Sequence, residues 1–113
     1  MPFITLEYTS NLHSNLDLQS FFSALHQTVS EIGNTAVTNC MSRARKLDIY
    51  RAGEGAEQNS YVNLEIALLS GRSPDVLEAL GKAALDLLNE LFNEQDAPCY
   101  VHLTEIEKTH LFK

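Results

Sequence analysis

Positive charge is concentrated in one short segment of an otherwise acidic chain. The 113 residues carry a formal net charge of −7, yet half of the eight Lys and Arg residues fall within nine positions. They are Arg43, Arg45, Lys46 and Arg51, and only Asp48 opposes them there, so the segment carries +3 and the remainder −10. Such a patch focuses its field on a small anion, whereas the acidic remainder repels polyanions such as nucleic acid and anionic membranes.

Arginine suits a carboxylate because its planar fork donates two parallel hydrogen bonds. Arg43 and Arg45 are therefore candidate binding residues for a small carboxylate anion. The alternative is an exposed edge strand whose charges prevent aggregation, and composition alone favours this alternative. Arg72 is a third candidate, because it precedes a helix N-terminus whose free amides favour an anion. It is equally able to pair with Asp75 or Glu78.

Pro2 is the candidate catalytic residue. If Met1 is removed, Pro2 becomes an N-terminal secondary amine on a rigid ring. Burial and neighbouring cations disfavour the charged form of such an amine, so they bring its pKa toward the range in which it acts as a general base. Many chains begin Met-Pro without catalytic meaning, so this feature needs support from the rest of the site.

The remaining residues point away from metal, redox and membrane functions. Cys40 and Cys99 lack CxxC spacing, which favours buried thiols, and the four histidines lack HxxxH or HExxH spacing. We expect no metal and no cofactor. No apolar run approaches the roughly 18 residues of a membrane span, and the N-terminus lacks a basic n-region followed by an apolar stretch. We expect a single cytoplasmic domain over residues 1–113.

Alternating and helical periodicities predict the elements that position these residues. Strands are expected at 3–8, 43–51, 61–69 and 100–106, helices at 18–32 and 74–91, and a mobile loop at 52–60. Asn15 or Asp17 is expected to cap the first helix, and Gly33 to end it in the left-handed conformation. Ser73 as N-cap followed by Pro74 is expected to start the second helix.

The resulting order, β-α-β-β-α-β, predicts an α+β fold. Each β-α-β unit gives a parallel pair of strands through a right-handed crossover, and the strand at 61–69, apolar on both faces, is expected to be central. Two helices cover only one face of a four-stranded sheet. Because the other face also carries apolar residues, we expect a partner subunit to cover it.

Four features in this order resemble the 5-carboxymethyl-2-hydroxymuconate isomerase family of the tautomerase superfamily. They are Pro2 before the first strand, Ser42-Arg43 with Asp48 and Tyr50, the turn Gly71-Arg72-Ser73, and the ending His110-Leu111-Phe112-Lys113.

The resemblance implies a cofactor-free homotrimer with active sites near the subunit boundaries. Pro2 would move a proton from the 2-hydroxyl of a dienol to carbon, and Arg43, Arg45 and Arg72 would bind the carboxylates. The family often has an arginine where this chain has Met41, so either Arg45 substitutes for it or the substrate has one carboxylate fewer. Two other functions stay open, namely a tautomerase for a simpler 2-keto acid and a non-catalytic oligomeric anion-binding domain.

Overall fold

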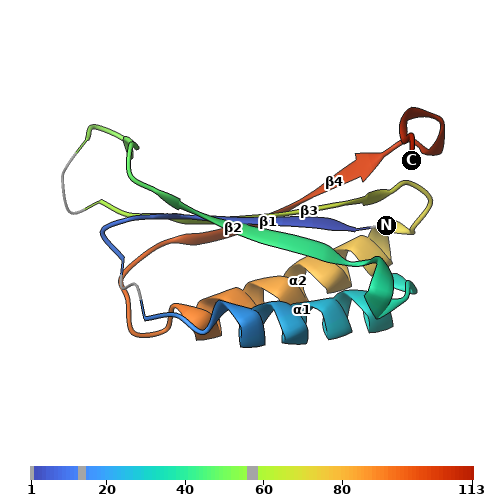
Figure 1. The fold of residues 1–113 in the computed structure, drawn as a ribbon, viewed down its shortest axis with the longest axis horizontal. Helices are drawn as coiled ribbons and strands as arrows, with labels where there is room; N and C mark the ends of the chain where they lie inside the picture. Colours follow the sequence, from blue (N-terminus) through green and yellow to red (C-terminus); the bar gives the residue numbers. More distant parts are fainter. Residues whose placement is uncertain (1, 13–14, 56–58) are drawn as a thin grey trace.

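Four strands and two helices form two layers, as Figure 1 shows. The computed structural model describes residues 2–12, 15–55 and 59–113. Its elements are β1 (Phe3–Thr9), α1 (Leu18–Gly33), β2 (Met41–Leu47), β3 (Val62–Leu69), α2 (Pro74–Leu91) and β4 (Cys99–Ile106), with short 3-10 turns η1 (Val37–Asn39) and η2 (Lys108–His110).

The sheet has the order β2-β1-β3-β4. The pairs β1–β2 and β3–β4 are parallel, and β1 and β3 meet antiparallel at the centre. Both helices lie on one face, which confirms the predicted α+β fold and the central position of β3 (Figure 1). The other face is covered by neither α1 nor α2, and we call it the open face.

Strand alternation builds the core between the sheet and the helices. Every second residue of β1 and β3 is buried under the helices, because successive side chains on a strand point to opposite faces. The helices contribute apolar stripes at three- and four-residue spacing. The fully buried large side chains are Pro2, Ile4, Leu6, Thr9, Leu25, Val29, Val62, Leu64, Ile66, Leu68, Leu80 and Leu88.

The predicted helix starts are confirmed, whereas the end of α1 is corrected. Asp17 and Ser73 accept hydrogen bonds as the N-caps of α1 and α2. The left-handed residue after α1 is Asn34, with φ of 55°, and not Gly33, which is its last helical residue. Asparagine tolerates this conformation, so the left-handed position does not need Gly33.

The second strand is displaced relative to the prediction. It begins at Met41 and ends at Leu47, so Ile49 and Arg51 lie outside it. Ile49 is 97% exposed, and the Arg51 guanidinium donates to the Glu54 carbonyl at 3.0 Å. Of the predicted loop at 52–60, positions 56–58 lie outside the described residues.

Candidate functional site

Pro2 lies at the end of the sheet where several elements meet. The N-terminus, the end of α1, the end of β3 and the start of α2 all lie at this end, on the right of Figure 1. The Pro2 ring is less than 2% exposed, and its carbonyl accepts a hydrogen bond from the Met41 amide at 3.0 Å. This bond aligns the start of β1 with the start of β2, so the position of Pro2 is fixed by the sheet.

Arg72 is held at the same end of the sheet by two backbone carbonyls. Its Nε donates to the Gly33 carbonyl at 2.8 Å, and its Nη1 donates to the Leu69 carbonyl at 2.9 Å. A Cβ at Gly33 would lie 3.5 Å from the Arg72 Nε, which is an ordinary van der Waals distance, so this contact does not require glycine. The two hydrogen bonds use two of the five N–H groups, and three are left for a ligand.

The two contacts take the place of the predicted ion pair of Arg72 within the chain. Among the described residues Arg72 forms no ion pair with Asp75 or Glu78. Its bond to Gly33 satisfies a carbonyl of the last turn of α1, where helices leave carbonyls without partners inside the helix. Arg72 therefore joins α1 to the β3–α2 turn and fixes the direction of its remaining donors.

Three rows of residues on the open face run across all four strands. The row nearest Pro2 is apolar in its first three members, and the next two rows are polar and charged. In strand order β2-β1-β3-β4 the rows are Met41, Phe3, Ala67, Thr104; then Arg43, Thr5, Glu65, His102; then Arg45, Glu7, Asn63, Tyr100.

Arg43 and Arg45 lie on this open face, at increasing distance from Pro2. At about 3.3 Å per residue, Arg43 is about 7 Å and Arg45 about 13 Å beyond the Met41 row. Arg43 is exposed and faces Thr5, and it has no ion pair among the described residues. Arg45 pairs with Glu7 at 3.8 Å. Of the two, Arg43 is the one without an ion-pair partner among the described residues.

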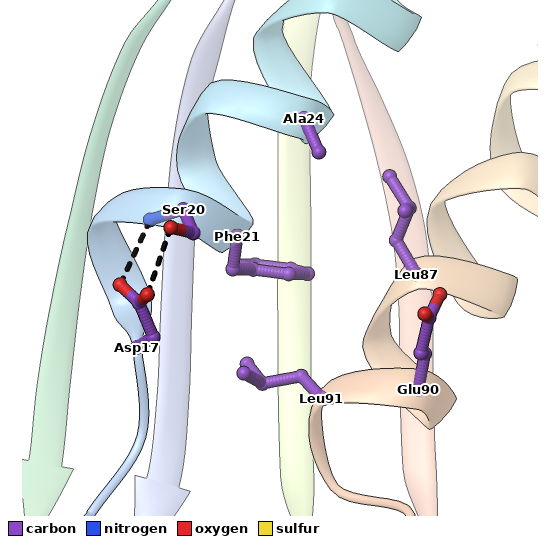
Figure 2. Close-up of a pocket in the computed structure, with 7 residues that line it drawn as sticks. All are labelled: Asp17, Ser20, Phe21, Ala24, Leu87, Glu90 and Leu91. Carbon is purple, nitrogen blue, oxygen red and sulfur yellow. Dashed lines mark hydrogen bonds between the residues drawn. The ribbon is translucent and has the colours of Figure 1, made fainter.

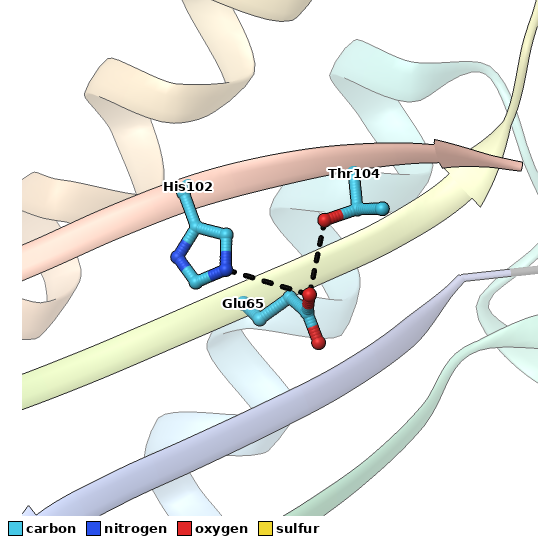
Figure 3. A network of polar contacts seen from close by, with 3 residues as sticks. All are labelled: Glu65, His102 and Thr104. Carbon is cyan, nitrogen blue, oxygen red and sulfur yellow. Dashed lines mark hydrogen bonds and ion pairs between the residues drawn. The ribbon is translucent and has the colours of Figure 1, made fainter.

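A carboxylate network occupies the β3–β4 half of the open face, as Figure 3 shows. Glu65 Oε2 accepts from the Thr104 hydroxyl at 3.0 Å and lies 3.4 Å from His102 Nε2. His102 and Glu65 remain 51% and 40% exposed in the single chain. The two contacts orient Glu65 toward β4, away from Arg43 on β2.

The cavities that are lined by described residues include none of the predicted site residues. The single chain therefore does not gather these residues into one of those cavities. One cavity of about 280 Å³ lies between α1 and α2, lined mainly by Phe21, Ala24, Leu87 and Leu91 (Figure 2). Its Asp17 carboxylate is already used by Ser20. Pro2 and Arg72 share one end of the sheet, whereas Arg43 and Arg45 lie on its open face.

The cysteines and histidines offer no metal centre in the described part of the chain. Both cysteines are free, and burial raises the pKa of the Cys40 and Cys99 thiols. A raised pKa disfavours the thiolate, which is the reactive form. No helix among the described residues is long and apolar enough to cross a membrane.

Sequence reasoning missed three contacts of this region. They are the pairing of Glu7 with Arg45, the carbonyl contacts of Arg72, and a hydrogen bond between His26 and Ser42. The predicted parallel pairing puts Glu7 and Arg45 on neighbouring strands. The register is what places them on the same face and opposite each other.

Comparison with protein families gives one match over nearly the whole chain. The family model described as 5-carboxymethyl-2-hydroxymuconate isomerase matches residues 2–111. A search of curated protein sequences finds no match.

Comparison with solved structures shows the same fold in several proteins. A 5-carboxymethyl-2-hydroxymuconate isomerase from Deinococcus radiodurans R1 has a TM-score of 0.87 at 24% identity, covering 99% of this chain and 87% of that one. A macrophage migration inhibitory factor-like protein from Entamoeba histolytica has a TM-score of 0.73 at 13% identity, covering 99% and 94%. A fused 4-OT wild-type symmetric trimer has a TM-score of 0.78 at 19% identity, covering 96% and 90%.

Proposed function

Because the chain belongs to the 5-carboxymethyl-2-hydroxymuconate isomerase family, we propose that it converts 5-carboxymethyl-2-hydroxymuconate or a similar dienol to the conjugated 2-oxo form. The family match supports an isomerase or tautomerase activity. The observation that carries the finer proposal is the position of Pro2, buried at the same end of the sheet at which two carbonyls hold Arg72.

Pro2 acts as the general base in this proposal, and no cofactor takes part. While Met1 is attached, the Pro2 nitrogen belongs to an amide and has no basic lone pair, so removal of Met1 is required. The free nitrogen would then be a secondary amine in a poorly solvated place, since the ring is less than 2% exposed. Burial disfavours protonation of an amine, so it lowers the pKa and leaves a larger fraction of base at neutral pH.

The proposed reaction moves one proton and no other atom. The amine takes the proton of the 2-hydroxyl, the O–H electron pair forms the 2-oxo group, and the double bonds shift along the chain. The protonated amine then returns the proton to the carbon at the far end of the diene. Negative charge spreads over the conjugated system between these steps, and fixed cations stabilise it best where water is excluded.

The arginines have unequal parts in this proposal. Arg72 is held by two carbonyls and keeps three N–H groups for a carboxylate near Pro2. Arg43 has no ion-pair partner among the described residues and is suited to a second carboxylate. Arg45 would bind a third only by competing with Glu7, 3.8 Å away. This competition favours the reading in which the substrate has fewer carboxylates than the one in the family name.

A homotrimer completes the proposed site. Arg43 and the Pro2 ring lie on opposite faces of one sheet, so one chain does not surround a substrate with both. The open face bears Met41, 50% exposed, beside Phe3 and Ala67, which suits burial against a second copy. Two of the similar structures are described as symmetric trimers, which supports this number of subunits.

The experiment that tests the proposed function is turnover of a substrate series in water, followed by ultraviolet absorbance. Protein whose intact mass lacks Met1 is assayed on dienols with three, two and one carboxylates. We expect turnover, with kcat/KM rising at least about tenfold from one to two carboxylates. No turnover of any member would refute the isomerase proposal and leave the non-catalytic anion-binding domain. Equal rates across the series would refute arginine recognition.

A further inference from the structure

One side-chain hydrogen bond joins helix α1 to strand β2 in the described part of the chain. His26 Nε2 lies 2.9 Å from Ser42 Oγ, and both side chains are half-buried. Which atom donates depends on the imidazole tautomer. The proton-transfer proposal above uses neither residue, yet Ser42 is the direct neighbour of Arg43.

Strand β2 has few other constraints on its position. It is an edge strand that pairs with β1 alone, and four of its seven residues are exposed. Its face toward the helices presents Ser42, Ala44 and Lys46, in place of the large apolar side chains that anchor β1 and β3. A strand with so little apolar anchoring depends on specific polar contacts for its distance from the helix layer.

Ser42 is well placed to pass such a constraint to Arg43. It lies opposite Ile4, between Met41, whose amide donates to the Pro2 carbonyl, and Arg43, which faces Thr5. Successive side chains on a strand point to opposite faces, so fixing Ser42 against α1 sets the rotation of the strand and the direction in which Arg43 leaves the open face. No ion pair with a described residue fixes the direction of the Arg43 side chain, so this direction depends on the strand.

We propose that His26 is a positioning residue of the site, and that its hydrogen bond to Ser42 holds Arg43 where it binds a substrate carboxylate. This inference rests on the proposed function for the identity of the ligand. His26 touches no reacting atom in this scheme. Its effect is on anion affinity, transmitted through one residue of β2.

The test measures anion binding separately from catalysis. Tricarballylate, a stable tricarboxylate, serves as the probe, with its dissociation constant from calorimetry and KM and kcat on the best dienol. Ser42→Ala and His26→Ala are expected to weaken tricarballylate binding and raise KM by about threefold to tenfold, with kcat within about twofold. Ser42→Thr and His26→Gln keep a hydrogen-bonding atom near the same place and should restore most of the affinity. Gln27→Ala is the matched control, because Gln27 donates to Glu31 on the same helix and does not touch β2.

A double-mutant cycle with Arg43→Ala decides whether the effect passes through Arg43. In the Arg43→Ala background, adding Ser42→Ala should change the dissociation constant by less than about 1.5-fold. The proposal would be overturned if Ser42→Ala weakened tricarballylate binding as much in the Arg43→Ala background as in wild-type protein. It would also be overturned if the Ser42→Ala protein bound tricarballylate with wild-type affinity. If wild-type protein binds tricarballylate but turns over no dienol, the proposed isomerase activity is refuted. The double-mutant cycle then still tests the positioning role by itself. If wild-type protein does not bind the probe, the positioning role is refuted.

Discussion

Replacing Arg72 should cost the protein stability as well as substrate affinity. Its guanidinium donates to the carbonyls of Gly33 and Leu69, which belong to α1 and β3. Hydrogen bonds from a charged group contribute about 1.5–3 kcal/mol each. Because Arg72 is half-buried and water can replace part of both bonds, we expect Arg72→Ala to lower the free energy of unfolding by about 2 kcal/mol.

Arg72→Lys separates the charge from the geometry. An ammonium is a single point of charge and reaches one carbonyl where the guanidinium fork reaches both, so about half of the loss should remain. Lys82→Ala is the matched control, because the one ion pair of Lys82 with a described residue is an exposed pair with Glu78, 2.9 Å away. Such a pair contributes about 0.3–0.5 kcal/mol.

The assay is urea unfolding followed by circular dichroism, because the chain has no tryptophan for fluorescence. For a domain of this size a loss of 2 kcal/mol corresponds to a Tm about 8 °C lower. A free energy of unfolding for Arg72→Ala within 0.5 kcal/mol of wild type, the usual range of a surface substitution, would refute the inference that Arg72 joins α1 to β3. A kcat/KM that falls less than about tenfold with that loss of stability would give Arg72 a purely structural role.

Three further substitutions test other parts of the account. Ser73→Ala removes the side-chain acceptor of the Val76 amide at the start of α2, so we expect about 1 kcal/mol less stability in urea unfolding, with unchanged kcat. Glu7→Gln releases Arg45 and should tighten tricarballylate binding by about twofold to fivefold in calorimetry, while its effect on stability stays below about 1 kcal/mol; unchanged binding would show that Arg45 is not within reach of the ligand. The Ser20 hydroxyl and amide hold the pKa of Asp17 below its usual range, so the stabilising charge is present above the unfolded-state pKa and is lost as pH falls through the folded-state pKa. Asp17→Asn should therefore be less stable than wild type at pH 7, and the difference should close in acid; a difference independent of pH would contradict this cause.

The fold could be predicted from local chemistry. Ser73 followed by Pro74 supplies an acceptor and a preset backbone angle at one position, and α2 begins there. The strand predicted at 61–69 has apolar residues on both faces, which requires a central position, and β3 is central. Local chemistry did not decide which of two adjacent residues takes the left-handed conformation after α1. In the structure this residue is Asn34 and not Gly33.

The site could be predicted only as a set of residues. Arg72 contacts the carbonyl of Gly33, a residue 39 positions away, and no pattern near either one specifies that distance. The partner of Arg45 depends on which residue of β1 lies opposite, because a shift of one residue would move Glu7 to the other face. The arginine pattern thus indicates anion chemistry, and the register decides which arginines are available for it.

The most direct test of the Pro2 mechanism is to block its nitrogen without changing the ring. An alanine inserted between Met1 and Pro2 leaves the proline but turns its nitrogen into an amide, and intact mass verifies the terminus of each protein. We expect kcat on the best dienol to fall by at least about a hundredfold, which is the lower end of what general base catalysis contributes. Turnover by the blocked protein equal to that of the Met1-free protein would contradict the assignment of Pro2 as the base.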